Sequence, residues 1–135
     1  MQITLPLTLA LHLLASVFWA GSTFALARTA AASADLLFWP QIVAAAGAIV
    51  TGGYLWRLLH PSFGTQEQVL ALGALCAILA VGAQAALCGP ALQQHKRARA
   101  EHKGGQLQTR VTLGQRVAAG LLALTVICMA VARYI

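Results

Sequence analysis

The chain has 135 residues, of which 59% are hydrophobic and 9% charged. Ordinary soluble domains carry about 25% charged residues, so the composition excludes that class and indicates a membrane protein. The formal net charge is +6, which by itself fits either a nucleic-acid partner or a membrane surface.

Four long apolar segments occupy most of the chain, at about residues 5–27, 36–59, 69–92 and 111–131. Each is near the ~20 residues that an α-helix needs to cross hydrocarbon. The predicted fold class is therefore all-α, a polytopic membrane protein whose four transmembrane helices form an antiparallel bundle. Residues 1–135 form a single domain, and any chemistry must lie among the helices or in short loops.

The first segment begins after Pro6 and ends near Arg28. It is not expected to be a cleaved signal peptide, because no basic residue precedes it and its apolar run is too long. The loop that follows has only a few residues, which makes the second helix an antiparallel neighbour of the first.

An ionisable residue, His12, lies inside this first segment. Such residues are costly in a membrane and are by default a functional-site hypothesis. Ser16, Trp19 and Thr23 follow at offsets of four, three and four residues, so all four share one helix face, which should face protein. At about 1.5 Å per residue, His12 lies on the order of 10 Å below the membrane surface.

The later helices are delimited by prolines and glycines. The second is expected to open around Trp39-Pro40 and to close at His60, before Pro61. The third should stop or kink at Gly89-Pro90, with residues 93–99 extending as a basic helix that Gly104-Gly105 breaks before the fourth.

Basic residues are distributed unevenly along this topology. Only Arg57 and Arg133 fall on one side of the membrane, and the excess lies on the side of the connections after helices one and three. The positive-inside rule therefore places those two connections in the cytoplasm. We therefore expect both termini outside. The expected location of this multi-pass protein is a bacterial inner membrane. Seven of the nine basic residues fall on the cytoplasmic side: Arg28, Lys96, Arg97, Arg99, Lys103, Arg110 and Arg116.

The basic stretch at 93–99 contains no aromatic residue that could stack on a base, so nucleic acid is not an expected partner. It serves either as a topology anchor or as a contact for anionic lipid. The expected partners are the lipid bilayer and a homodimer or larger membrane complex.

The topology gathers nitrogen and sulfur donors in the outer half of the bundle. Imidazole with soft sulfur is preferred by Cu(I), while imidazole alone suits haem iron or Cu(II). The acidic residues all belong to loops or loop edges, so calcium and magnesium sites are not expected. The predicted ligands are His12 and His60, with weaker candidates in Cys76, Cys128 and Met129.

Each donor also has a purely structural interpretation. His12 could hydrogen-bond a facing helix and hold two helices in register. His60 could be a solvated interfacial residue, and the sulfur residues could simply fill the core. Arg57, one turn before His60, either reaches the headgroups or holds an anion such as a haem propionate. The predicted pocket-lining residues are Ser16, Trp19, Thr23 and Arg57.

Familiar catalytic constellations are absent from the sequence: it has no buried carboxylate pair, no Ser/His/Asp set and no phosphate-binding loop. Hydrolysis and phosphoryl transfer are therefore not expected. Redox turnover stays open, because a cofactor would bring that chemistry and the protein need only supply ligands and a pocket.

At Leu11-His12-Leu13-Leu14 with Phe18-Trp19-Ala20-Gly21, the chain resembles the copper-resistance protein D family, whose members carry a histidine followed by tryptophan-x-glycine in an early transmembrane helix. Thr51-Gly52, Arg110 and Ala132-Arg133-Tyr134 resemble the small four-helix members of that group more faintly. The resemblance implies a role in copper handling or transport. Longer members have about eight helices, so a complete transport path in this chain would need a dimer.

The chain is also similar to the HemJ-type protoporphyrinogen oxidases, which share a haem-ligating histidine in helix one. By that resemblance His12 would be an axial ligand of haem b. Three functions are therefore expected from the sequence: copper handling through a site in the outer half of the bundle, haem b binding for electron transfer or porphyrin oxidation, or a structural subunit without a cofactor.

Overall fold

The computed structural model describes the backbone of residues 3–98 and 104–135, and the side chains of residues 3–94 and 108–135. Within these ranges all regular secondary structure is helical. Four helical stretches are long and apolar enough to cross a membrane. The predicted fold class is confirmed: the chain is an all-α, multi-pass membrane protein with four spans.

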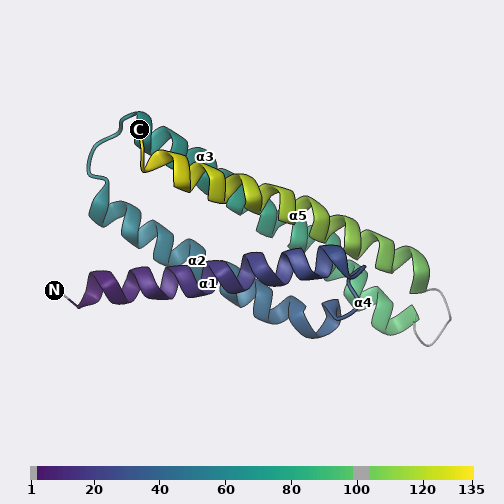
Figure 1. Ribbon diagram of the computed structural model, residues 1–135. Coiled ribbons are helices and arrows are strands. Elements are labelled where there is room, and N and C mark those ends of the chain that lie inside the picture. The colour runs from purple at the N-terminus through teal and green to yellow at the C-terminus, as the bar shows by residue number, and fades with distance from the viewer. Residues whose placement is uncertain (1–2, 99–103) are drawn as a thin grey trace.

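Figure 1 shows the helices coloured in chain order. A π-helical turn, η1, joins α3 to α4. The rod formed by α3, η1 and α4 runs without a break, which at about 1.5 Å per residue is on the order of 50 Å. It is therefore longer than a hydrocarbon layer of about 30 Å. The bounds are α1 Thr4–Arg28, α2 Ala34–Leu59, α3 Thr65–Ala83, η1 Gln84–Cys88, α4 Gly89–Ala98 and α5 Gly104–Ala132.

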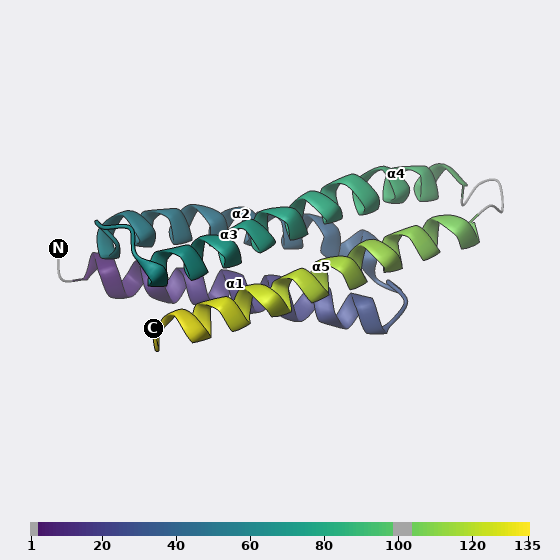
Figure 2. The ribbon, with the colours of Figure 1, turned by 90° about the horizontal axis from the view of Figure 1, so that it is seen from above.

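The bundle is built from two antiparallel pairs. α1 crosses α2, and α3 runs beside α5 in both views (Figures 1 and 2). The start of α1 and the end of α5 lie at one end of the bundle, which we call the terminal end. The α1–α2 turn and α4 lie at the other, which we call the basic end, and α4 extends beyond that turn (Figure 2).

The arginines that the structure describes lie where the charge pattern places them along the helices. Arg28 and Arg110 belong to the basic end, and Arg57 and Arg133 to the terminal end. The side chains of Lys96, Arg97, Arg99 and Lys103 fall outside the described residues.

Three expected helix boundaries are wrong. α2 opens at Ala34, so Pro40 lies inside the helix, on its exposed side. Gly104 begins α5 instead of breaking the chain before it. Gly89-Pro90, expected to stop or kink the third span, does not stop it, and the helix continues from the π turn through α4. A proline ring clashes with the carbonyl four residues earlier in an α-helix, and the wider π turn relieves that clash.

Small residues dominate the core between the helices. One buried cluster lies around Trp19 and Leu122, and a second lies nearer the basic end around Leu26 and Val111. Alanines fill most of the remaining buried positions in both. Small surfaces let transmembrane helices approach closely, and a Cβ added at Gly73 of α3 would stand 3.0 Å from Cys128 Cβ of α5.

The turn between α1 and α2 is strained. Ala30 and Ala31 have φ angles of 51° and 57°, a left-handed conformation that costs a non-glycine residue about 1–2 kcal/mol. The turn is held by the Ala31 N–H, which donates to Leu26 O at 2.9 Å, a bond typical of a helix C-cap in which glycine is usual. The side chain of Gln108 also donates to Ala30 O at 3.0 Å.

Ala30→Gly is therefore expected to raise the free energy of unfolding by about 0.5–1 kcal/mol, the left-handed strain less the added chain entropy of glycine. Thermal unfolding in detergent measures it. Ala32→Gly is the matched control, because Ala32 is exposed in the same turn without a positive φ, and it should be neutral or destabilising. Equal effects of the two substitutions would contradict the strain.

Candidate functional site around His12

The polar stripe of α1 faces the rest of the bundle, as its spacing predicts. Trp19 and Thr23 are buried, and His12 and Ser16 are half-buried. The residues of this stripe nevertheless contact two separate parts of the bundle. His12 packs on α2, whereas Trp19 and Thr23 belong to the hydrogen-bonded core.

The imidazole of His12 is fixed to α2 through one ring nitrogen. Nδ1 lies 2.9 Å from Ala48 O and 3.0 Å from Thr51 Oγ1. The Thr51 hydroxyl donates its own proton to Gly47 O at 2.6 Å, so its oxygen is left to accept. A carbonyl can only accept, and the proton therefore belongs on Nδ1. The lone pair of the neutral ring is then on Nε2, for which the described residues supply no hydrogen-bonding partner.

A glycine makes this arrangement possible. A Cβ at Gly52 would stand 3.0 Å from His12 Cε1 and 3.5 Å from Nδ1, so any other residue would displace the ring. Ala48, Thr51 and Gly52 together form the surface that receives the imidazole, which we call the His12 seat. The neighbouring Gly53 has nothing within 4 Å of the position of an added Cβ.

His60 occupies a different environment. Its Nδ1 lies 3.0 Å from Glu67 Oε1, and the other carboxylate oxygen of Glu67 accepts the Gly64 N–H at 2.8 Å. The His60 ring also lies 5.8 Å from that of Trp56. These contacts close the α2–α3 loop, so His60 has a clear structural role.

The structure does not unite the predicted ligands in one cluster. Cys76 and Cys128 are buried free thiols, and Cys128 packs on Gly73. Met129 and Arg57 are exposed. Among the residues that the structure describes, no group of three histidine, cysteine or acidic side chains is placed to hold a metal ion.

A buried amide network is the polar feature that the sequence analysis missed. It consists of three glutamine side chains from three helical segments, joined to α1. Gln84 Oε1 accepts from Trp19 Nε1 at 2.8 Å, and Gln84 Nε2 donates to Thr23 Oγ1 at 2.9 Å. Gln84 Nε2 also donates to Gln115 Oε1 at 3.1 Å. The members of the network are Trp19, Thr23, Gln41, Gln84 and Gln115.

The remaining bonds satisfy the network internally. Gln115 Nε2 donates to Gln41 Oε1 at 3.2 Å, and Gln41 Nε2 donates to Thr23 Oγ1 at 3.2 Å. Every amide oxygen and nitrogen thus has a partner within the bundle, and all three glutamines are 0% exposed. A fully satisfied polar group in the core fixes how helices pack, and this one leaves no group directed at a ligand. The available signal in the sequence was one glutamine inside each of three apolar spans.

Comparison of the chain with protein-family models, with curated proteins and with solved structures finds no match. The resemblance to the copper-resistance protein D family stays a prediction.

Proposed function

We propose that this chain is a membrane protein that binds haem b or a copper ion, with His12 Nε2 as the ligand atom. The observation that carries the proposal is the hydrogen bond from His12 Nδ1 to Ala48 O at 2.9 Å. Metal-ligating histidines almost always donate their second ring N–H to a carbonyl or carboxylate, which fixes the tautomer and the ring orientation.

Of the two groups, haem b fits the arrangement better. Haem iron can be held by one axial imidazole from a chain, and His12 is a single donor with a fixed tautomer. Gly52 lets the ring lie directly against α2, and the Nε2 lone pair is left without a hydrogen-bonding partner among the described residues. Bound haem would supply one-electron chemistry, while the chain would hold its iron and exclude water.

Copper handling is the second candidate. It is supported by two buried free thiols, Cys76 and Cys128, because soft sulfur is a preferred ligand of Cu(I). Cys128 packs between α3 and α5, whereas His12 is seated on α2. A site with more than one ligand would therefore draw its further donors from a second copy or a partner protein.

The third candidate function is that of a structural subunit without a cofactor. Its support is the same bond, since a hydrogen bond between transmembrane helices is worth about 0.6 kcal/mol on average and would hold α1 and α2 in register without any ligand.

The three functions give different results for the purified protein and its His12→Ala variant, reconstituted with haem or copper. We expect a Soret band that falls at least about tenfold in the variant and persists in His60→Ala. If the variant binds less copper than the unaltered protein and neither shows a Soret band, the result supports copper handling. Equal copper and no Soret band in both, with a lower unfolding temperature, selects the structural role and contradicts the cofactor site.

A glycine pair gives a sharper test of the His12 seat. Gly52→Ala should displace the ring and weaken haem or copper binding by roughly tenfold or more, as the loss of groups that orient a ligand does. Gly53→Ala should leave binding unchanged, because an added Cβ there meets nothing within 4 Å. Titration of each variant followed by absorbance measures the difference, and equal affinities would contradict the seat.

A further inference from the structure

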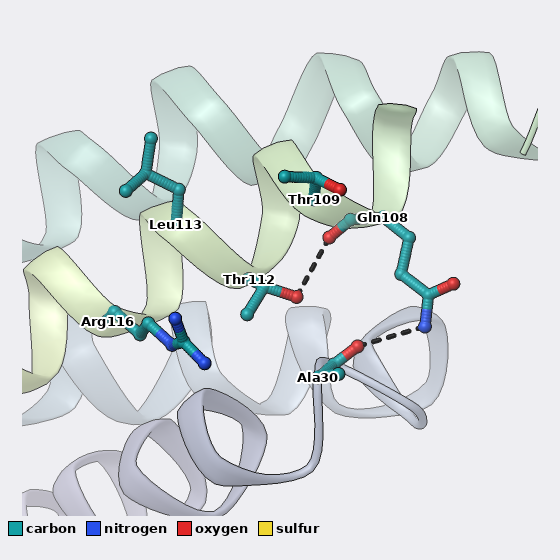
Figure 3. A pocket seen from close by; sticks show the side chains of 6 residues that line it. All are labelled: Ala30, Gln108, Thr109, Thr112, Leu113 and Arg116. Carbon is teal, nitrogen blue, oxygen red and sulfur yellow. Dashed lines mark hydrogen bonds between the residues drawn. The ribbon is translucent and has the colours of Figure 1, made fainter. Parts of the chain in front are cut away.

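A hollow of about 350 Å³ lies at the basic end, where α5 passes the end of α1. Its size falls within the range of about 300–1,000 Å³ that is usual for ligand pockets. Figure 3 shows polar side chains of α5 on one side and the turn after α1 on the other. The lining residues are Ala30, Gln108, Thr109, Thr112, Leu113 and Arg116.

Arg116 supplies the charge of this hollow. It lies eight residues beyond Gln108, where the fourth span begins, so it is about 12 Å along the helix. Its Nε–H donates to Ala27 O at 3.4 Å, which orients the guanidinium and leaves both terminal amino groups without a partner among the described residues. The single ion pair in the described part of the chain, His60–Glu67, involves no arginine. The charge of Arg116 is therefore uncompensated there.

The walls of the hollow are fixed by hydrogen bonds. The Gln108 amide donates to Ala30 O at 3.0 Å, and the Thr112 hydroxyl donates to Gln108 O at 2.9 Å (Figure 3). Leu113 of the same helix also lines the hollow and is 56% exposed. The hollow thus combines a cationic, polar wall with an exposed leucine at the end of a membrane span. Such an amphiphilic surface suits a ligand with an anionic head and an apolar tail.

We propose that this hollow binds the phosphodiester headgroup of an anionic phospholipid, with the terminal amino groups of Arg116 on the phosphate and an acyl chain along Leu113. The planar guanidinium presents paired N–H donors that match phosphate geometry. Basic pockets between transmembrane helices on the cytoplasmic side are a known setting for anionic lipids. The site is separate from His12 and does not depend on the function proposed there.

The test measures lipid binding by the purified protein in a neutral detergent. Dioleoylphosphatidylglycerol is titrated while the unfolding temperature is followed, with dioleoylphosphatidylcholine and inorganic phosphate as separate arms. We expect protection by phosphatidylglycerol alone. In Arg116→Gln its apparent affinity should fall about tenfold or more, because charge-assisted hydrogen bonds to the phosphate are lost together with the charge. Arg28→Gln removes the same charge at the same end outside the hollow, and it should lower the affinity by about fivefold at most, the effect of one basic residue on anionic lipid.

Three results would overturn the proposal. Equal losses in Arg116→Gln and Arg28→Gln would show diffuse attraction to the charged end. Equal protection by inorganic phosphate would show a site for free anions, and equal protection by phosphatidylcholine would show a general lipid effect. If Arg116→Gln does not fold, Arg116→Lys and Arg28→Lys replace the pair. Lysine keeps the charge but not the paired donors, so only Arg116→Lys should then weaken binding, and equal affinities would count against the site.

Discussion

Replacing Gln84 with leucine is expected to lower the free energy of unfolding by about 2 kcal/mol. The substitution keeps similar volume but removes the acceptor of Trp19 Nε1 and the donor to Thr23 and Gln115. Single hydrogen bonds between transmembrane helices are worth only about 0.6 kcal/mol on average, because the unfolded chain finds other partners in the membrane. A buried polar group left unsatisfied adds about 1–3 kcal/mol, so the Trp19 indole N–H decides the size of the effect.

Gln94→Leu is the matched control, since Gln94 is exposed on α4 and its loss should change stability by less than about 0.5 kcal/mol. Unfolding titrations in mixed micelles provide the values. The second check is a cycle with Trp19→Phe. Because Trp19 and Gln84 bond each other, the double substitution should cost less than the sum of the two single ones. Strictly additive values would argue against the bond.

Gly114→Ala should be as damaging as the loss of Gln84, although it adds a single methyl group. A Cβ at Gly114 would stand 2.9 Å from Cys88 Sγ and 3.0 Å from Leu87 Cβ, both in η1. Cys88 is 0% exposed and cannot move aside freely. Overpacking of this kind costs about 1–3 kcal/mol, and here it would push the π turn away from α5.

Gly120→Ala supplies the comparison on the same helix. Gly120 is exposed and an added Cβ meets nothing within 4 Å, so alanine should raise stability by about 0.5–1 kcal/mol through its better helix propensity. The two substitutions are thus expected to shift the unfolding temperature in opposite directions. A shift of the same sign in both would show that α5 does not pack on η1 as described.

The four spans were predictable because hydrophobicity over about 20 residues decides whether a helix crosses a membrane. Their ends were less so. Pro40 was expected in a first turn, but the helix opens earlier at Ala34. Gly89-Pro90 was expected to stop or kink the third helix, which continues from η1 into α4 without a stop. Cys88, the last residue of the π turn, lies against α5 with its thiol 3.6 Å from Val111 O, a contact between spans that no local pattern records.

For the candidate site, the costly histidine and the face it shares with Trp19 and Thr23 could be deduced from spacing alone. The partners could not, because which carbonyl His12 meets depends on how α1 crosses α2. The glutamines lie inside the predicted spans, but their amides are uncharged and are not soft metal donors. Neither charge nor ligand chemistry therefore marks them as candidates. An uncharged amide inside an apolar span is itself a sign of contact between helices.

The second half of α1 is packed more tightly in the bundle than the first half. All four of its buried residues lie from Trp19 onward, while its first half is tied to α2 mainly by the half-buried His12. Local opening of a protein takes least free energy where buried contacts are few, so the first turns of α1 should separate from the bundle before its second half does. A ligand bound at His12 would favour the closed form by mass action. Ligand binding at His12 and packing of the first turns of α1 on the bundle would then be thermodynamically coupled, so each would favour the other.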